Sequence, residues 1–372
     1  MISIRYVSSS RSPSGYGSAA RAFITALFCA GVNLSCDNLM QMAEFTNYGI
    51  TGDIADRLSN RMIPYKVMII HLTPDLIPTY KEEGIYTINH LFWEMDKLPK
   101  EWIQPLNSID EIWTASQQMA EMIGRSGVTT PCYAFSQPID TGKATENIES
   151  FLLEFPKDFT FYTIGQWIDR KNFKGLLHAY WKTFQKEEKV SLLIKTYRVN
   201  YSDSEYNFIK RDIEQWKNEL RLSHYPKVLL TKHLLSDEQI VKLHKMGDCY
   251  VSASSGEGWN RPMQEAMLYG NPVISGDNGG ITDIMTDQYY YKIPSTHVNA
   301  TEQSHIPWYT SSMRWKLLDK ESLGKQMKFM FDNYDKTLER SKKAQEYIVN
   351  NFSFQKIGNM MKERLEQISV TL

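Results

Sequence analysis

The sequence predicts an α/β protein built from two doubly wound domains that face a cleft. Short apolar runs alternate with helix-length segments along the whole chain, and most of these runs are nearly continuously apolar. This pattern is typical of parallel strands that helices cover on both faces. The runs form two series of about five, which indicates two sheets rather than one. A length of 372 residues also suits two domains of ordinary size.

Ten apolar runs are the strand candidates. In the first half of the chain they cover residues 2–7, 66–72, 84–90, 111–116 and 131–136. In the second half they cover residues 160–166, 191–197, 227–234, 249–253 and 272–275. A polar, proline-containing stretch separates the two series. We therefore predict a first domain over residues 1–155 and a second over residues 156–352.

A final helix is predicted over residues 353–372. Ser353 can act as its N-cap, and Phe352 and Ile357 occupy the positions of a hydrophobic staple. Apolar residues recur after them at near-helical spacing, so we expect this helix to cross back and pack on the first domain. In doubly wound folds ligands bind at the carboxyl ends of the strands, which makes the cleft the expected site.

Composition excludes several classes of protein. No stretch approaches the ~20 consecutive apolar residues that a membrane span needs, so we predict no transmembrane segment. The four cysteines are scattered, which favours free thiols and a cytoplasmic location, while peripheral attachment to a membrane stays open. Residues 1–150 carry 11 basic and 16 acidic side chains, and the remainder carries 31 and 27. The acidic half is a poor footprint for nucleic acid, whereas the more basic half suits a phosphorylated ligand.

The strongest motif extends from Gly256 to Met267 (GEGWNRPMQEAM) and follows an apolar strand. Its two glutamates, Glu257 and Glu265, lie eight residues apart, the first in a loop and the second on a helix that starts near Pro262. A carboxylate accepts paired hydrogen bonds from a vicinal diol, so two carboxylates can hold two hydroxylated parts of one extended ligand. Solvated glutamates are the plainer interpretation, but the flanking strand, glycines and proline favour a site.

This motif and the strand after it, residues 248–280, resemble the signature of glycosyltransferase family 4. The shared pattern is an apolar strand, E-G, an aromatic residue, P, E-A-M, G-N-P-V-I and a glycine pair. The resemblance implies the GT-B fold of two Rossmann-like domains, a retaining reaction and a nucleoside-diphosphate sugar as the donor. It implies that Glu265 binds the ribose hydroxyls and Glu257 the sugar hydroxyls. It also places four further residues in the donor site: Gly258, Trp259, Asn260 and Arg261. Asn260 stands where relatives often have glycine.

A glycine-rich turn near the N-terminus resembles a second element of the family. Gly15, Tyr16 and Gly17 lie between the first strand and a helix predicted over residues 19–30. In the family this loop approaches the donor diphosphate. Glycines allow close approach of the backbone, and a helix N-terminus offers free N–H groups and a partial positive charge.

Cations follow the first two strands of the second half. The segment IGQWIDRKN resembles the family's strand-G-R…R-K-G element, in which Arg170 and Lys171 occupy positions that bind the diphosphate. The family's usual arginine is Gln166 here, and its usual glycine after the lysine is Asn172, so which cation binds which phosphate stays open. Lys195 ends the next strand and resembles a further phosphate ligand. The resemblance favours these roles over those of ordinary surface cations.

Two histidines, His71 and His90, each end an apolar strand of the first half. A histidine at a strand end is commonly a hydrogen-bonded structural residue. His90, however, resembles the family's active-site histidine, which lies over the donor sugar. The resemblance therefore implies a catalytic role for His90 beside Glu257 and Lys171.

The sequence thus predicts an enzyme that transfers a hexose from a nucleoside-diphosphate sugar to a hydroxyl acceptor with retention of configuration. Side-chain cations can offset the diphosphate charge, and no H-x-x-x-H pair, cysteine cluster or D-x-D triplet occurs, so we expect no metal and no cofactor besides the donor. The acceptor stays open between a glycan, a glycolipid, a protein and a modified nucleic acid. Three alternatives also stay open: a sugar-nucleotide epimerase, a non-catalytic glycosyltransferase-like subunit, and an enzyme that modifies phage DNA bases.

Overall fold

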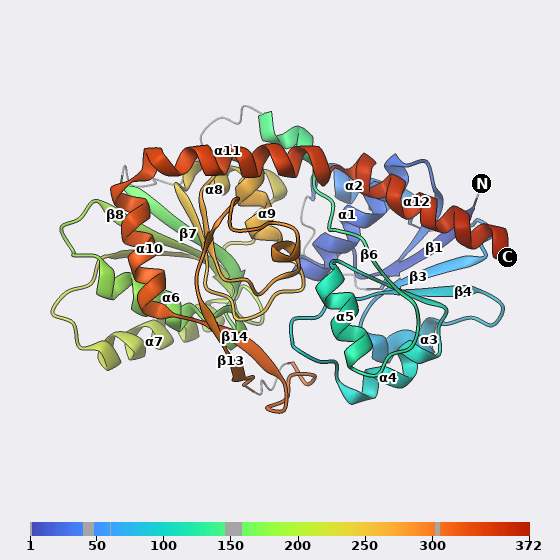
Figure 1. Cartoon of the computed structure of the whole chain (residues 1–372), viewed down its shortest axis with the longest axis horizontal. Helices are drawn as coiled ribbons and strands as arrows, with labels where there is room; N and C mark the ends of the chain where they lie inside the picture. Colours follow the sequence, from blue (N-terminus) through green and yellow to red (C-terminus); the bar gives the residue numbers. More distant parts are fainter. Residues whose placement is uncertain (1, 40–47, 60, 146–157, 302–305) are drawn as a thin grey trace. The chain divides into compact units, whose positions relative to one another are not determined.

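The computed structural model of the chain describes residues 2–39, 48–59, 61–145, 158–301 and 306–372. The chain divides into two compact units (Figure 1). The first comprises Met1–Glu146 and Ile348–Leu372, and the second comprises Asn147–Tyr347. Each contains one six-stranded parallel sheet with helices, so the predicted α/β fold class is confirmed. The predicted boundary between residues 155 and 156 lies outside the described residues.

The first unit contains a parallel sheet of order β2-β1-β3-β4-β5-β6. Its strands are β1 (Ser3–Ser8), β2 (Asn33–Asn38), β3 (Val67–His71), β4 (Tyr86–His90), β5 (Glu111–Thr114) and β6 (Cys132–Ala134). Its connecting α-helices are α1 (Gly15–Cys29), α2 (Gly49–Leu58), α3 (Ile77–Tyr80), α4 (Lys100–Asn107) and α5 (Gln117–Arg125), with short 3-10 helices at Pro74–Leu76 and Thr141–Thr145. All five predicted strands are confirmed. The edge strand β2 was not predicted, because its sequence NLSCDN is mostly polar.

The second unit contains a parallel sheet of order β12-β11-β10-β7-β8-β9. Its strands are β7 (Phe159–Gln166), β8 (Val190–Tyr197), β9 (Lys227–Thr231), β10 (Cys249–Ser252), β11 (Val273–Ser275) and β12 (Tyr291–Lys292). Its α-helices are α6 (Phe173–Thr183), α7 (Asp203–Leu220), α8 (Asp237–Met246), α9 (Arg261–Leu268) and α10 (Lys320–Asp332), with 3-10 helices η3 (Asp169–Lys171) and η4 (Gly280–Asp283). An antiparallel hairpin of β13 (Ser295–Asn299) and β14 (Arg314–Leu318) is a feature that the sequence did not reveal. The five predicted strands of this half are also confirmed.

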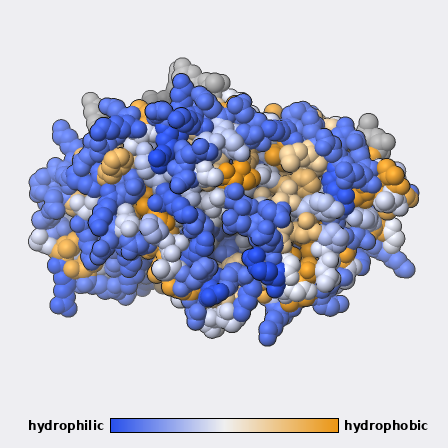
Figure 2. All heavy atoms as spheres, in the orientation of Figure 1, coloured by the Kyte–Doolittle hydropathy of each residue, from blue (hydrophilic) through white to orange (hydrophobic). Residues whose placement is uncertain are grey.

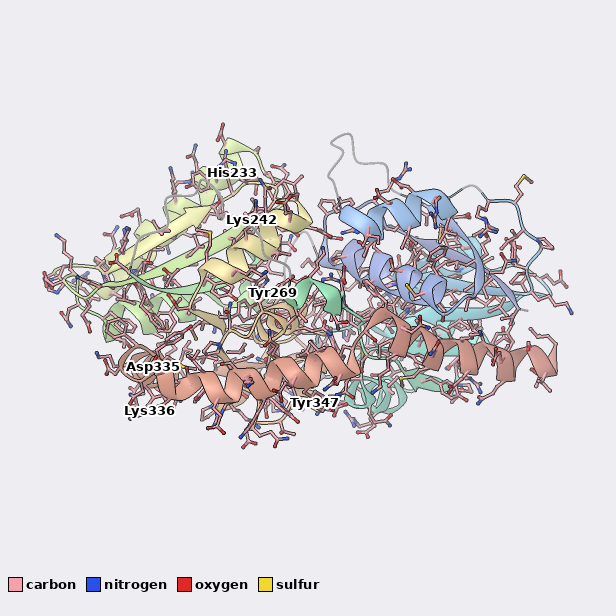
Figure 3. All side chains as sticks on the ribbon, turned by 90° about the horizontal axis from the view of Figure 1, so that it is seen from above. His233, Lys242, Tyr269, Asp335, Lys336 and Tyr347 are labelled. Atoms are coloured by element: carbon pink, nitrogen blue, oxygen red, sulfur yellow. The ribbon has the colours of Figure 1, made fainter. Side chains whose placement is uncertain are left out.

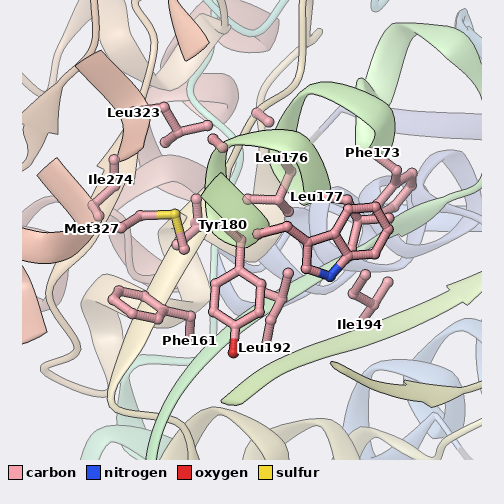
Figure 4. Packing of buried hydrophobic residues seen from close by; sticks show 14 of the residues in the cluster. Phe161, Phe173, Leu176, Leu177, Tyr180, Leu192, Ile194, Ile274, Leu323 and Met327 are labelled. Atoms are coloured by element: carbon pink, nitrogen blue, oxygen red, sulfur yellow. The ribbon is translucent and has the colours of Figure 1, made fainter. Parts of the chain in front are cut away.

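Alternate residues of a strand point to the same face of the sheet, and in the second unit the apolar ones on one face form the core. Phe161, Leu192 and Ile194 are buried on one face, where α6 and α10 cover them (Figure 4). Tyr180 of α6 lies in this core and donates a hydrogen bond from its hydroxyl to the carbonyl of Lys227, at 2.9 Å. This packing fixes the positions of β7 and β8, and the loops that follow them carry the predicted site.

The helix α12 (Phe354–Thr371) returns to the first unit and packs on α1. As predicted, Ser353 is its N-cap and accepts a hydrogen bond from the backbone N–H of Lys356, at 3.2 Å. Gly358 makes a close approach possible, because a Cβ atom at this position would lie only 2.0 Å from the carbonyl oxygen of Ala26 on α1. Arg364 extends this contact by donating to the fully buried carboxylate of Glu111.

The helix α11 (Tyr334–Asn351) precedes α12 along the chain. Asp335 and Lys336 lie near its first residue, and Tyr347 lies three turns further on (Figure 3). The face drawn in Figure 2 is mostly hydrophilic, with apolar areas between hydrophilic ones. Among the helices that the structure describes, none is both long enough and apolar enough to cross a membrane.

Gly358→Ala should destabilise the protein by about 1–3 kcal/mol, because the added methyl group must push α12 away from α1. Thermal unfolding of the two proteins measures this as a lower Tm of the variant. Gly124→Ala is the matched control, since it lies in α5 with no atom within 4 Å of the added Cβ, and it should be neutral or slightly stabilising. A Gly358→Ala protein as stable as the wild type would show that the contact between the two helices is loose.

Candidate functional site

The donor-site residues predicted in the second unit follow adjacent parallel strands. Arg170 and Lys171 lie on η3 after β7, Lys195 lies near the end of β8, and Glu257 lies in the loop after β10. Since β10, β7 and β8 are neighbours, the carboxyl ends of these strands lie at the same edge of the sheet. In parallel α/β sheets this edge is where ligands bind.

Glu257 lies between two cations. Its Oε1 atom is 2.5 Å from Nζ of Lys171, and its Oε2 atom is 3.2 Å from Nη1 of Arg170. The Glu257 side chain is 8% exposed, and those of Arg170 and Lys171 are 9% and 16% exposed. Burial alone would raise the pKa of Glu257, but the charges of Lys171 and Arg170 outweigh it and lower the pKa. The three residues therefore form an ion-paired cluster with a net charge of +1. This cluster is largely shielded from solvent.

The backbone around this cluster is firmly held. Nη1 of Arg170 also donates to the carbonyl of Gly256, and the carbonyl of Arg170 accepts from the N–H of Ser255 at 2.7 Å. The N–H of Glu257 donates to the carbonyl of Asn278 at 2.8 Å. These bonds join the loops after β7, β10 and β11, so the carboxylate and its two cations are fixed relative to the sheet.

Two positions where the sequence departs from the family's usual glycine have the same explanation. Asn172 and Asn260 both adopt the left-handed conformation, with φ angles of 52° and 78°. Asparagine tolerates this region better than other residues with a side chain. Asn172 also caps α6, accepting a hydrogen bond from the N–H of Gly175 at 3.1 Å. The two asparagines therefore keep a backbone conformation that glycine favours.

Gln166 and Lys195 lie near the ends of the adjacent strands β7 and β8. Gln166 donates from its side-chain amide to the carbonyl of Arg198 at 2.8 Å, so it connects β7 to the loop after β8. Lys195 is 6% exposed, and its Nζ atom lies 5.4 and 5.3 Å from the ring centroids of Tyr197 and Tyr201. Within the described residues no carboxylate pairs with it. Burial lowers the pKa of Lys195 to about 8.

Glu265 lies on α9, and its side chain is 16% exposed. Its Oε1 atom accepts from Nε of Arg261 at 2.8 Å, and its Oε2 atom lies 3.3 Å from Nε2 of His244 on α8. Burial would raise the pKa of Glu265, but Arg261 and His244 lower it to about 2, so the carboxylate stays ionised.

The other predicted residues of the motif build the loop rather than the charged cluster. Trp259 is 3% exposed and donates from its indole N–H to the side-chain carbonyl of Gln264 at 3.0 Å. The start of η4 packs closely against Gly258. A Cβ atom on Gly280 would lie only 2.4 Å from the carbonyl oxygen of Gly258. The motif thus sets the shape of the loop between the two glutamates.

His244, the partner of Glu265 on α8, was not predicted as a site residue. A lone histidine in an amphipathic helix carries no spacing signal, and its contact with Glu265 depends on how α8 and α9 pack. Asn271, in the turn after α9, belongs to the G-N-P-V-I part of the resemblance, which assigned it no role. It donates from its side-chain amide to the hydroxyl of Tyr162 at 2.7 Å.

The glycine-rich turn of the first unit forms the start of α1. Ser14 caps this helix, and its hydroxyl accepts from the N–H of Gly17 at 3.2 Å. A Cβ atom on Gly17 would lie 2.3 Å from the carbonyl oxygen of Ser12, so this glycine lets the preceding loop approach. Gly15 is exposed, and a Cβ atom there would meet no atom within 4 Å. Open space at Gly15 leaves room for another group near the helix N-terminus.

His90 lies inside an aromatic cluster of the first unit. Its ring centroid is 4.6 Å from that of His71, 4.2 Å from that of Phe23 and 5.3 Å from that of Phe92. The hydroxyl of Tyr6 lies 2.7 Å from Nδ1 of His71 and 3.3 Å from Nδ1 of His90. Both histidines are fully buried, and burial lowers the pKa of each, that of His71 to about 3. A contact between His90 and a sugar would therefore require the surrounding rings to move.

The family model for glycosyl transferases group 1 matches residues 144–303. This segment contains β7 to β13 and therefore every residue of the charged cluster. No relative was found among curated protein sequences.

Several solved structures share the fold. HepE from Anabaena, in complex with UDP and glucose, is 13% identical over 99% of this chain and 100% of that chain, with a TM-score of 0.70. Sucrose-phosphate synthase from Thermosynechococcus elongatus is 12% identical over 100% of both chains, with a TM-score of 0.71. A glycosyltransferase from Rickettsia africae is 14% identical over 99% of this chain and 98% of that chain, with a TM-score of 0.68. The two Rossmann-like domains of this chain therefore have the GT-B fold.

Asn172→Ala should lower the free energy of unfolding by about 1–3 kcal/mol, because alanine is strained at φ of 52° and cannot cap α6. Asn172→Gly should cost less, since glycine adopts this conformation freely. Thermal unfolding of the two variants gives the order, and Asn359→Ala, on the exposed face of α12, controls for the loss of an asparagine. Equal stability of the alanine and glycine variants would contradict a conformational role for Asn172.

Proposed function

We propose that this chain, whose residues 144–303 match the glycosyl transferases group 1 family on a GT-B fold, transfers a sugar from a nucleoside-diphosphate sugar to a hydroxyl acceptor. One observation carries the proposal. Two ionised carboxylates and four cations, all of them largely buried, lie at or just beyond the carboxyl edge of one parallel sheet. The carboxylates are Glu257 and Glu265, and the cations are Arg170, Lys171, Lys195 and Arg261. Such a concentration of buried charge is costly for stability, which favours a functional reason for it.

The cations suit a diphosphate. Arg170 and Lys171 already share one carboxylate, so their combined charge is partly balanced, whereas Lys195 has no carboxylate partner among the described residues. In the proposed complex Lys195 and the exposed part of Lys171 bind the phosphate oxygens, and Arg170 holds Glu257 in place. Cations positioned at a leaving diphosphate stabilise the negative charge that develops as the glycosidic bond breaks.

The two glutamates suit the two sugars of the donor. Each carboxylate oxygen of Glu265 accepts one hydrogen bond within the protein and keeps a further lone pair, so it can accept from the vicinal hydroxyls of a ribose. Glu257 lies on the loop beside the cations, where the proposal places the transferred sugar. HepE, solved with UDP and glucose, makes UDP the first nucleotide to test.

The finer parts of the proposal come from the resemblance to glycosyltransferase family 4. They are retention of configuration, independence from metal ions, the approach of the Gly15–Gly17 turn to the diphosphate, and a contact of His90 with the donor sugar. The charge of Arg170, Lys171 and Lys195 supports a role for side chains in place of a metal ion. The acceptor is proposed only as a hydroxyl compound.

The alternative of a non-catalytic subunit rested on Gln166 and Asn260, which depart from the family pattern. Asn260, like Asn172, adopts the conformation that glycine would adopt, so it does not disrupt the loop of the site. Gln166 donates to the carbonyl of Arg198 at 2.8 Å and so is part of the same edge of the sheet. Both glutamates of the motif, Glu257 and Glu265, are present, and the pKa of each is lowered, so both carboxylates are ionised. These observations favour an active enzyme.

The function can be tested by incubating the protein with UDP-, GDP- and ADP-sugars and a panel of simple glycoside acceptors. We expect release of one nucleoside diphosphate, an α-linked product from an α-linked donor by proton NMR, and undiminished turnover in EDTA. Glu257→Gln should lower the rate by about 10²–10³, which separates the chain's own activity from that of a contaminant.

Three outcomes bear on separate parts of this proposal. A β-linked product from an α-linked donor would contradict retention of configuration. Loss of turnover in EDTA that Mn²⁺ restores would contradict independence from metal ions. A protein that neither transfers nor hydrolyses any of these donors would favour the non-catalytic alternative.

Nucleoside diphosphate affinity should fall as the pH rises through about 8. Lys195 has a pKa of about 8 in the free protein, so it is mostly charged below this pH and mostly neutral above it, and only the charged amine attracts phosphate strongly. Calorimetry with UDP between pH 6.5 and 9.5 should show a dissociation constant that rises about tenfold.

Lys195→Met and Lys195→Arg are the matched variants for this titration. The methionine variant should bind UDP weakly at every pH, and the arginine variant should keep a flat profile because its charge persists. A fall in affinity that is the same in the wild type and in Lys195→Met would assign the titration to another group.

A further inference from the structure

A line of buried side chains leads from the interior of the second unit to Glu265. The side-chain amide of Asn271 lies 2.7 Å from the hydroxyl of Tyr162, and that hydroxyl lies 2.9 Å from Nδ1 of His244. Nε2 of His244 lies 3.3 Å from Oε2 of Glu265. Tyr269, which follows α9, lies beside α8 (Figure 3), and its ring centroid is 5.5 Å from that of His244.

The direction of each hydrogen bond in this line follows from the chemistry of the groups that it joins, starting at Glu265. An ionised carboxylate only accepts hydrogen bonds, so Nε2 of His244 must carry a hydrogen and donate it to Glu265. With the hydrogen on Nε2, Nδ1 can accept the O–H of Tyr162. Burial raises the pKa of Tyr162 well above its ordinary value, so this hydrogen is retained. The amide of Asn271 then donates to the Tyr162 oxygen. Every bond thus points toward Glu265.

The line is also rigid. Tyr162 and His244 are fully buried, and Asn271 is 9% exposed. A Cβ atom at position 247 would lie 2.2 Å from the Tyr162 ring, so Gly247 allows that ring to pack against the end of α8. The amide of Asn271 makes a second bond, of 2.5 Å, to the carbonyl of His244. Three elements, β7, α8 and the turn after α9, therefore hold the imidazole in one orientation.

The carboxylate at the end of this line has two positions left for a ligand. Arg261 occupies one lone pair of Oε1, at 2.8 Å, and His244 occupies one lone pair of Oε2. One lone pair remains on each oxygen, and the side chain is 16% exposed. Because both oxygens are held from inside the protein, the two free lone pairs have a fixed direction, as recognition of a vicinal diol requires.

We infer that His244, oriented by Tyr162 and Asn271, is a positioning residue that fixes the Glu265 carboxylate for recognition of the ribose hydroxyls, an inference that rests on the proposed function. Without the Nε2 donor, only Arg261 holds the carboxylate, so its orientation is less fixed and its preference for a diol declines. The line therefore determines how strongly the protein distinguishes a ribonucleotide from a deoxyribonucleotide.

The test compares the dissociation constants of UDP, GDP and ADP with those of their 2′-deoxy forms. The wild type should bind the ribose form of the preferred nucleotide more tightly. His244→Leu should reduce this preference by about tenfold while leaving the affinity for the deoxy form nearly unchanged. His244→Gln should keep the preference, since its terminal amide can donate to Glu265 as Nε2–H does. If His244 only stabilised the fold, its replacement would weaken the binding of the ribose and deoxyribose forms alike. The leucine and glutamine variants would then behave in the same way.

Tyr162→Phe is the second variant, to be used if circular dichroism shows that His244→Leu does not fold. It removes only the hydroxyl that orients the imidazole, and it should reduce the preference for ribose about threefold. An unchanged preference in the folded variants overturns the role of His244 while the proposed function stands. A wild type that binds ribose and deoxyribose forms equally overturns the role of Glu265 and this inference together. A wild type that binds none of the six probes overturns the proposed function as well.

Discussion

The candidate site depends on the burial of one carboxylate between two cations. Removing a carboxylate from water costs several kcal/mol, and only close charge partners offset this cost. Glu257 meets that condition through Lys171 at 2.5 Å and Arg170 at 3.2 Å. The loops after β7, β10 and β11 must then stay together, because a displacement of any of them would leave a buried charge without its partner. The ion-paired cluster thus determines the geometry of the whole edge of the sheet.

The surrounding loops show how that geometry is maintained. The left-handed backbone at Asn172 turns the chain directly from the cation-bearing 3-10 helix into α6, and the one at Asn260 turns it into α9. Both turns lie within a few residues of a charged side chain of the cluster. Backbone strain at such positions persists only where the surrounding structure holds it in place. The two glutamates are therefore presented from opposite ends of one rigid loop-and-helix segment, Glu257 before the turn and Glu265 after it.

Much of this could be predicted from the sequence, for reasons that the structure makes clear. Ten strands were found because parallel strands buried on both faces have continuous apolar runs, whereas β2 escaped because an edge strand can be polar. Glu257, Glu265, Arg170 and Lys171 were predicted as site residues because they lie in motifs that resemble those of a known family. The structure places Glu257 between Arg170 and Lys171. The contact of His244 with Glu265 joins residues 21 positions apart on different helices, and no local pattern encodes it. The enclosure of His90 by aromatic rings likewise depends on the packing of β1, β3, β4 and α1.

The return of α12 to the first unit has a consequence for the order of folding. Ala26 on α1 meets Gly358 on α12, and Glu111 meets Arg364, so the first unit is completed by segments separated by more than 250 residues. During synthesis the apolar side of α1 emerges long before its covering helix, and the whole second unit is made in between. Contacts of such high sequence separation are formed late and slowly, and uncovered apolar surface invites association with other chains. A ribosome-bound chain that has completed its second sheet thus still presents an unfinished first domain to the chaperones that meet it.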